Sequence, residues 1–408
     1  MAGAFFYSRG QQAQRTQPRL PSLHKREEMG IDSYRACVWE KWMKERRRWG
    51  FLAGIGLEVL AICLLLYSYR SGSADAVSQN AGSRTETEGE RESETEQETE
   101  EDFIRWVDFG VTCEAMKQAY AYDTQTYGQE IHLDWLDLLA YLGAKYGGDF
   151  SRYQKKDLEQ AAQSVLGGEA AWEELTGKLS YYEYYREAYG AVLGGLVGAY
   201  EEEEQDESGK VSWVKKYGLK GFSPIAKGFP YSDYDDFGVA RSYGYRRNHL
   251  GHDMMGQVGT PIVAVESGVV AVMGWNQYGG WRIGINSFDG KRYYYYAHLR
   301  QNFPYCKTLK EGDVVQAGDV IGYMGRTGYS AKENVNNIDE SHLHFGLQLI
   351  FDESQREGVN EIWVSGYELV KFLHQNQSQV VRDDATKEWS RVYQIRDPAA
   401  EAFKKEKK

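Results

Sequence analysis

The chain has 408 residues, enough for two or three domains with a sizeable core. Its formal net charge of −12 argues against a nucleic-acid-binding protein, which would present a basic face to phosphates. Its four cysteines form no CxxC pair and so indicate neither a zinc ribbon nor a disulfide framework. The sequence leaves open whether Cys113 and Cys306 form a disulfide.

The first 102 residues divide into a basic, an apolar and an acidic segment. Residues 1–48 carry eleven Lys or Arg against five Asp or Glu, and residues 71–102 carry eleven acids against two arginines. Between them, residues 49–69 are mostly apolar and would span about 30 Å as a helix. The triple arginine before this run predicts one transmembrane helix, with residues 1–48 cytoplasmic and the rest of the chain outside.

Glu58 lies near the middle of the apolar run, where a carboxylate costs about 2–3 kcal/mol on insertion scales. Either its side chain is protonated or bonded locally, or it contacts another membrane protein. Residues 71–102 have almost no apolar side chains and cannot offset the entropy of ordering, so we expect a disordered acidic linker.

Residues 103–205 are expected to form a small helical domain. Leu136, Leu139, Ala140 and Gly143 recur at three- and four-residue intervals in a run that stops at Gly147-Gly148. We expect four or five short helices, among them His132–Tyr146, Gln154–Leu166, Glu169–Leu179 and Ser180–Tyr200. Residues 206–241 are expected to be a connector.

Residues 242–350 have a hydrophobic period of two, which predicts strands. One hairpin is expected from Pro261–Val265 and Gly268–Met273 around Glu266-Ser267, and another from Trp281–Ile285 and Lys291–Leu299. Many short strands with regular turns predict an antiparallel β-sandwich or barrel. The fold class is therefore an α+β multidomain chain. Residues 351–408 are expected to hold one helix, Val364–His374, and a frayed lysine-rich tail.

Five of the eight histidines fall in three short motifs: His249-Leu-Gly-His-Asp253, Tyr296-Ala-His298-Leu and His342-Leu-His344-Phe. A catalytic zinc takes three His or carboxylate ligands and leaves one position open for water. Gly251 argues against a helical HExxH site but allows a kink that brings His249 and Asp253 together. His342 and His344 are two apart on an expected strand and share a face, so spacing alone does not say which of them binds metal.

These motifs, in this order and over about a hundred residues, resemble the M23 family of lysostaphin-type zinc metallopeptidases. The resemblance implies one zinc ion held by His249, Asp253 and His344, with His298 and His342 acting on the water and the developing oxyanion. It also implies that a tyrosine upstream of the first histidine holds the transition state, and Tyr243 stands at that place, with Tyr245 as a substitute. His252 is expected at the surface or rim.

The resemblance implies a zinc metalloendopeptidase that hydrolyses peptide cross-links or stem peptides of bacterial peptidoglycan. The expected transmembrane helix independently predicts that it is anchored in the membrane with its catalytic domain outside the cytoplasm. Peptidoglycan peptides are therefore the expected partners, and no nucleic acid is expected. The alternative is a non-cleaving wall-binding or regulatory scaffold, although such relatives have typically lost a ligand or a catalytic histidine and none is missing here. The sequence leaves open which peptide bond is cut. It also leaves open whether the helical domain or residues 208–236 cover the groove in which the substrate peptide would bind.

Overall fold

The computed structural model describes residues 104, 107–242, 246–355 and 360–406. The expected transmembrane helix, the acidic linker and Tyr243 lie outside these residues. Within the described part, no helix combines the length and the apolar character that crossing a bilayer requires. Every element below belongs to one compact unit within residues 98–408.

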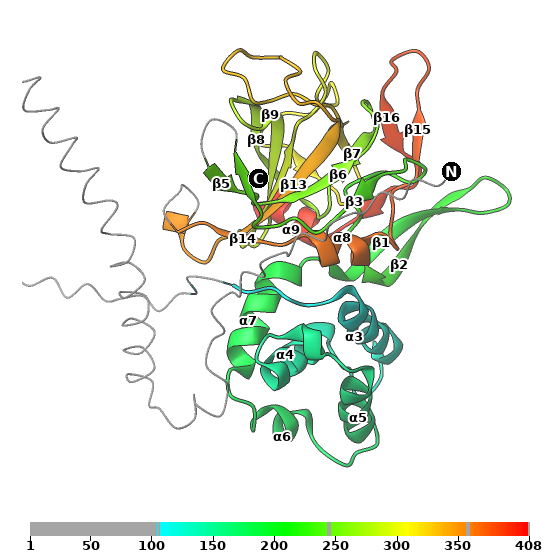
Figure 1. Cartoon of the computed structure of the whole chain (residues 1–408). Coiled ribbons are helices and arrows are strands. Elements are labelled where there is room, and N and C mark those ends of the chain that lie inside the picture. The colour runs from blue at the N-terminus through cyan, green and yellow to red at the C-terminus, as the bar shows by residue number, and fades with distance from the viewer. Residues whose placement is uncertain (1–103, 105–106, 243–245, 356–359, 407–408) are drawn as a thin grey trace, which may run out of the picture. The chain divides into compact units, whose positions relative to one another are not determined.

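Helices gather on one side of this unit (Figure 1). They are α3 (Cys113–Thr126), α4 (Trp135–Tyr146), the 3-10 helix η1 (Phe150–Arg152), α5 (Lys155–Leu166), α6 (Trp172–Thr176) and α7 (Tyr182–Leu193). The Asp134 carboxylate caps the first turn of α4 by accepting from the Leu136 and Asp137 amides. At the other end Gly147 takes a left-handed conformation with φ of 64°, so the expected stop at Gly147 is confirmed.

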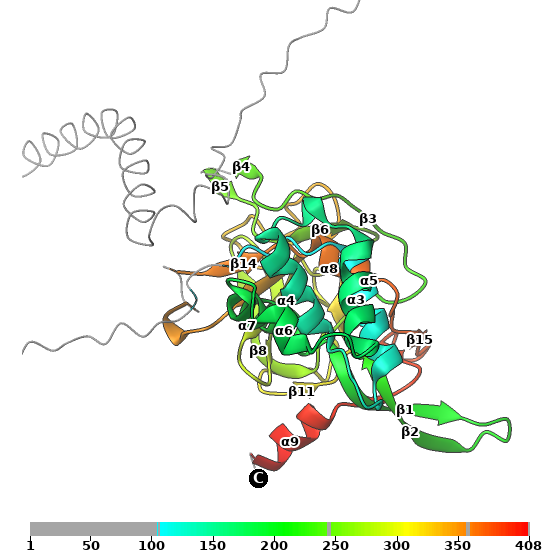
Figure 2. The same cartoon turned by 90° about the horizontal axis from the view of Figure 1, so that it is seen from below.

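The predicted helix Ser180–Tyr200 is too long, and the predicted connector begins inside regular structure. Helix α7 ends at Leu193, and β1 (Val197–Gln205) pairs antiparallel with β2 (Val211–Leu219). The run of glutamates in β1 fits a strand because Lys216 on β2 pairs with the carboxylates of Glu202 and Glu204. These two strands form a long hairpin that extends away from the body (Figure 2).

An antiparallel eight-stranded sheet carries the histidine motifs, as the period of two predicts. Its strand order is β11-β8-β9-β10-β13-β6-β3, with β14 also paired to β13. The bounds are β3 (Ser232–Asp233), β6 (His252–Met255), β8 (Gly268–Asn276), β9 (Gly280–Ser287), β10 (Arg292–Ala297), β11 (Val314–Val315), β13 (His342–Leu349) and β14 (Ile362–Val364). A smaller sheet pairs β7 (Pro261–Val263) with β12 (Val320–Tyr323), and β4 (Ala240–Ser242) pairs with β5 (Arg246–Asn248).

One of the two predicted hairpins is wrong. Strands β9 and β10 do pair across the turn at residues 288–291, whereas β7 pairs with β12 and β8 pairs with β9 and β11. The reason lies in Glu266, which the sequence presents as a turn residue. Its side chain is only 6% exposed and binds the buried Arg292, so the segment between β7 and β8 follows this ion pair instead of a tight turn.

The C-terminal part is more ordered than predicted. The expected helix is present as α8 (Tyr367–Leu373), but β15 (Val380–Arg382), β16 (Trp389–Arg391) and β17 (Ile395–Arg396) follow it. The lysine-rich end is helix α9 (Pro398–Glu406) and not a frayed tail. Asp397 holds its start by accepting from the Ala399 amide, while Lys220 donates to both Asp397 oxygens at 2.9 Å.

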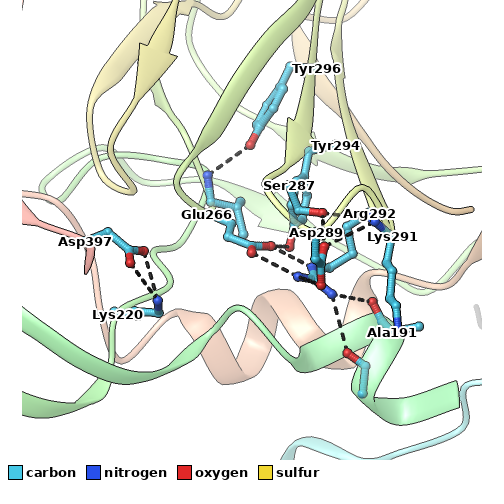
Figure 3. Close-up of polar contacts among 12 residues, drawn as sticks. Ala191, Lys220, Glu266, Ser287, Asp289, Lys291, Arg292, Tyr294, Tyr296 and Asp397 are labelled. Carbon is cyan, nitrogen blue, oxygen red and sulfur yellow. Dashed lines mark hydrogen bonds and ion pairs between the residues drawn. The ribbon is translucent and has the colours of Figure 1, made fainter. Parts of the chain in front are cut away.

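The helices and the large sheet share one hydrophobic core, which contains Leu139, Tyr189, Ile285 and Phe372. A buried polar junction adds to it (Figure 3). Arg292 Nε donates to Glu266 Oε2 at 2.7 Å, and Nη1 donates to the Ala191 carbonyl at the end of α7 at 2.8 Å. Tyr294 also donates to Glu266 Oε2 at 2.6 Å. The helical region is therefore a fixed part of the unit that holds the sheet.

Candidate metal centre

Two side chains from the large sheet and one that follows the small β4-β5 sheet converge on one point. His249 follows β5, Asp253 lies on β6 and His344 lies on β13 directly opposite Asp253. The His249 Nε2 atom lies 3.1 Å from Asp253 Oδ1 and 3.0 Å from His344 Nδ1, which is itself 2.8 Å from Asp253 Oδ1. These three atoms form a group that can hold a metal ion.

The kink expected at Gly251 has a packing reason. A Cβ at Gly251 would overlap the Cε1 and Nε2 atoms of the His344 imidazole. The missing side chain therefore lets the backbone between His249 and Asp253 lie against the ring of the third member. A helix through this segment would not bring the two side chains to His344 in this way.

His298 and His342 lie beside this group. The His298 ring centroid is 4.8 Å from that of His342 and 5.7 Å from that of His344. His298 has a positive φ of 62°, a strained conformation for a residue other than glycine that is found at functional sites. The residue directly follows β10, and its ring lies near those of the other two histidines.

Hydrogen bonds fix the tautomers of both flanking imidazoles. The His298 Nδ1 lies 2.9 Å from the Thr327 carbonyl, and the His342 Nδ1 lies 2.9 Å from the Glu340 carbonyl. A carbonyl can only accept, so Nδ1 carries the proton in each ring. The Nε2 lone pairs of His298 and His342 are left to accept a proton.

Burial and mutual contact set the charges of the group. Burial would raise the pKa of Asp253, but hydrogen bonds from His249 and His344 hold it well below its usual range. Burial lowers the pKa of His298 far below its usual value, and the nearby His342 and His344 lower it further. Burial also lowers the pKa of His344, against the opposing effect of Asp253. The centre therefore has an ionised carboxylate and neutral imidazoles at His298 and His344.

Two supporting residues could not be identified from the motifs. His249 Nδ1 lies 2.9 Å from Asp236 Oδ1 and donates to the Asp236 carbonyl at 3.4 Å, which leaves the opposite nitrogen, Nε2, for the metal group. Arg241 bridges the two carboxylates, with Nη1 at 2.8 Å from Asp253 Oδ2 and Nη2 bound to Asp236. Both residues lie in the segment expected to be a connector. Only their contacts with His249 and Asp253 in the folded protein identify them as supporting residues.

The prediction for His252 is wrong. Its side chain is buried and its Nε2 lies 2.8 Å from Asp233 Oδ2 on β3. Successive residues of β6 point to opposite faces, so His252 faces away from Asp253 and packs against Tyr367. Cys113 and Cys306 are both free, so the open question of a bridge between them is answered in the negative.

The part of the sequence that carries the histidine motifs is similar to known peptidases. A family model described as peptidase family M23 matches residues 247–357. The chain contains an M23 peptidase domain. The expected resemblance is thus confirmed, and the matched range contains all three histidine motifs.

Relatives of the M23 domain include endopeptidases. The L-Ala–D-Glu endopeptidase of Bacillus subtilis is 39% identical over 29% of this chain and 34% of its own length. The glycyl-glycine endopeptidase ALE-1 of Staphylococcus capitis is 35% identical over 33% of this chain and 30% of its own length. The lysostaphin catalytic domain from Staphylococcus simulans is 30% identical, covering 35% of this chain and 92% of that one, with a TM-score of 0.28. The chain spans about a third of the length of the two full-length relatives.

Proposed function

We propose that this protein is a zinc metalloendopeptidase that hydrolyses peptide bonds in bacterial peptidoglycan. The observation that carries the proposal is the convergence of His249, Asp253 and His344 on one point, with the Nε2 atoms of His298 and His342 left to accept protons beside it. The relatives named as endopeptidases support the same activity.

The donor set fits zinc. Two imidazole nitrogens and one carboxylate oxygen are the ligands of many catalytic zinc sites, which keep a fourth position for water. The Asp236 carboxylate beside His249 Nδ1 provides the outer support that such ligands usually have. A zinc ion held by these three residues would act as a Lewis acid, making water acidic and polarising a carbonyl.

The flanking histidines supply the proton chemistry. His298 is neutral, with Nδ1 held by Thr327, so its Nε2 can take a proton from the attacking water. His342 lies next to it, and a second proton on its Nε2, taken from solvent, would be available to the oxyanion that forms at the scissile carbonyl. Tyr243 is proposed to assist there by its place before His249. No residue of this set is a covalent nucleophile, so the proposed hydrolysis takes one direct attack by water.

Digestion of purified cell walls tests this function. The full-length protein, purified in detergent, should bind one zinc ion per chain and release fragments whose masses identify the cleaved bond. His249→Ala should lose both metal and cleavage, whereas His298→Ala should lose cleavage and keep the metal. A wild-type protein that is fully loaded with zinc but cleaves no wall would favour the non-cleaving scaffold instead.

We further propose that residues 49–69 anchor the protein in the cytoplasmic membrane with the M23 domain outside. The support is the apolar run flanked by the basic segment and the acidic linker. Membrane fractions should retain the full chain after a carbonate wash and lose it when residues 49–69 are deleted. Retention of the deleted protein would contradict the anchor without affecting the peptidase proposal.

A further inference from the structure

A groove leads away from the metal centre across the large sheet. It consists of two adjoining hollows of about 300 and 620 Å³. The first contains His249 and His298, and the second contains Glu361 and Trp363. Five residues line both hollows and so connect them: Arg247, Leu250, Tyr278, Tyr295 and His344.

Arg247 holds a fixed positive charge close to the reacting groups. Its guanidinium lies 4.9 Å from the ring centroid of Tyr329 and 5.7 Å from that of Tyr278, and it donates to the Tyr329 hydroxyl. The Tyr329 ring is in turn 5.8 Å from the His298 ring. The cation and His298 therefore lie near the same aromatic ring, and contacts with two tyrosines restrict the position of the cation.

The charges in the groove are not balanced near the metal centre. The first hollow is lined by Arg241 and Arg247 and, among the residues that the structure describes, by no Asp or Glu. Arg241 is already paired with Asp236 and Asp253. Arg247 contacts no carboxylate within the described ranges, and Glu361 lines only the second hollow.

We propose that Arg247 selects substrate peptides with a carboxylate next to the scissile bond. This inference rests on the proposed peptidase function and narrows its substrate. A carboxylate can accept two parallel hydrogen bonds from a guanidinium. A neutral peptide would displace water from the cation without offering a charged acceptor in its place. In peptidoglycan the free α-carboxylate of D-Glu, next to the amide that joins it to L-Ala, has this chemistry. Glycine bridges have no side-chain or free α-carboxylate next to their peptide bonds.

Three synthetic peptides test the proposal with the zinc-loaded full-length protein. They are a stem peptide with L-Ala joined to D-Glu, the same peptide with the D-Glu α-carboxylate converted to an amide, and pentaglycine. The amide has nearly the same shape without the charge. The acidic peptide should be cleaved with a kcat/KM about 10- to 100-fold above that of the amide, the size expected for one hydrogen bond to a charged group. Mass analysis of the products shows which bond is cut.

Variants show whether Arg247 causes this preference. Arg247→Gln should raise KM for the acidic peptide by about 10- to 100-fold, with a smaller change in kcat, and leave cleavage of the amide nearly unchanged. Arg247→Lys should restore part of the preference. Arg396→Gln is the matched control, because Arg396 also stacks on an aromatic ring, at 3.7 Å from that of Trp213, on the hairpin away from the groove. Thermal unfolding of each variant checks that the fold is intact.

The outcomes separate this inference from the proposed function. Equal cleavage of the acidic and amidated peptides, or cleavage of pentaglycine alone, would overturn the role of Arg247 and leave the peptidase intact. An unchanged preference in Arg247→Gln would do the same. Failure to cleave any peptide or any purified wall would overturn the peptidase proposal, and the substrate preference with it.

Discussion

Strand β10 has a buried polar cluster at each of its ends, and the two clusters are built differently. Arg292 at its start is a cation surrounded by Glu266, Asp289 and the carbonyls at the end of α7. At its other end His298 borders a group of His249, Asp253 and His344, whose donor atoms all lie within 4.8 Å of one another. In the first cluster the cation is at the centre, with the carboxylates and carbonyls around it. The second brings electron-pair donors together, an arrangement that an added metal ion stabilises.

The comparison shows that one buried cluster stabilises the fold and the other provides ligands for a metal. Arg292 is 2% exposed, and opposite charges with hydrogen bonds offset the cost of its burial. Glu266 and the α7 carbonyls reach it from two regions, so the cluster fixes the helices to the sheet. At the metal centre His249 and Asp253 are also buried whereas His344 is partly exposed, and a bound metal ion would stabilise their electron-pair donors. We therefore expect mutations in the Arg292 cluster to change stability. Mutations in the metal centre should change metal binding and catalysis.

The largest expected effect is at the metal centre. His298→Ala should lower kcat by about 10²–10⁴, the usual contribution of a proton-transferring side chain, and leave the zinc content near one per chain. His344→Ala should lower activity at least as much and also lose the metal. Wall-digestion rates with metal analysis measure both, and loss of metal in His298→Ala would show that this histidine is a ligand.

The next effect is at the start of β10. Glu266→Ala should destabilise the protein by about 3–5 kcal/mol because it leaves the Arg292 cation buried without its main partner. Urea unfolding measures the change. Zinc binding by the folded variant should stay as in the wild type, since the two clusters share no residue. An exposed pair, Lys404 and Glu401 on α9, is the control, and Glu401→Ala should change stability by less than about 1 kcal/mol.

Asp236→Asn should weaken zinc binding by about 10- to 100-fold, because the carboxylate beside His249 Nδ1 orients that ligand. Competition with a coloured zinc chelator measures the affinity directly, without reference to activity. Asp233→Asn is the matched control, since Asp233 contacts His252 on the face of β6 away from the metal. Similar losses in both variants would mean that the effect is on folding and not on ligand orientation.

A smaller effect is expected where α7 approaches the ion pair. A Cβ at Gly195 would overlap the Glu266 carboxylate, whereas one at Gly190 on α7 meets nothing within 4 Å. Gly195→Ala should therefore destabilise by about 1–3 kcal/mol, and Gly190→Ala should stabilise slightly because alanine favours helix. Thermal unfolding of both variants tests the close contact; equal stabilities would show that α7 tolerates a shift there.

A last expected effect concerns acid. The pKa values of His298 and His344 are lowered in the folded protein, so the unfolded chain binds more protons once the pH falls below about 6.5. Metal-free protein should therefore lose stability between about pH 6.5 and 5, by at most about 1.4 kcal/mol per pH unit for each histidine. Asp253 contributes only at lower pH, because its lowered pKa matters below about 3.9. Replacing His298 by Gln should flatten the profile measured in urea with a chelator present.

The helices show which structural features the local sequence pattern can predict and which it cannot. The end of α4 at Gly147 follows from a glycine in the left-handed conformation, which the sequence displays directly. The segment 197–205 is rich in glutamate and continues a helical pattern, yet it forms β1 because Lys216 on β2 pairs with its carboxylates. That partner lies more than ten residues away in the chain, so no local rule identifies it.

The sequence by itself determined the family, the antiparallel sheet and the five residues of the candidate centre, because the histidine motifs are short and each lies within a few residues. The tertiary structure decided which neighbours support them. Asp236 and Arg241 reach the centre from a segment without a motif, and Glu266 binds Arg292 from across the sheet. These contacts depend on strand register and on the way helices pack, which are long-range properties of the folded chain.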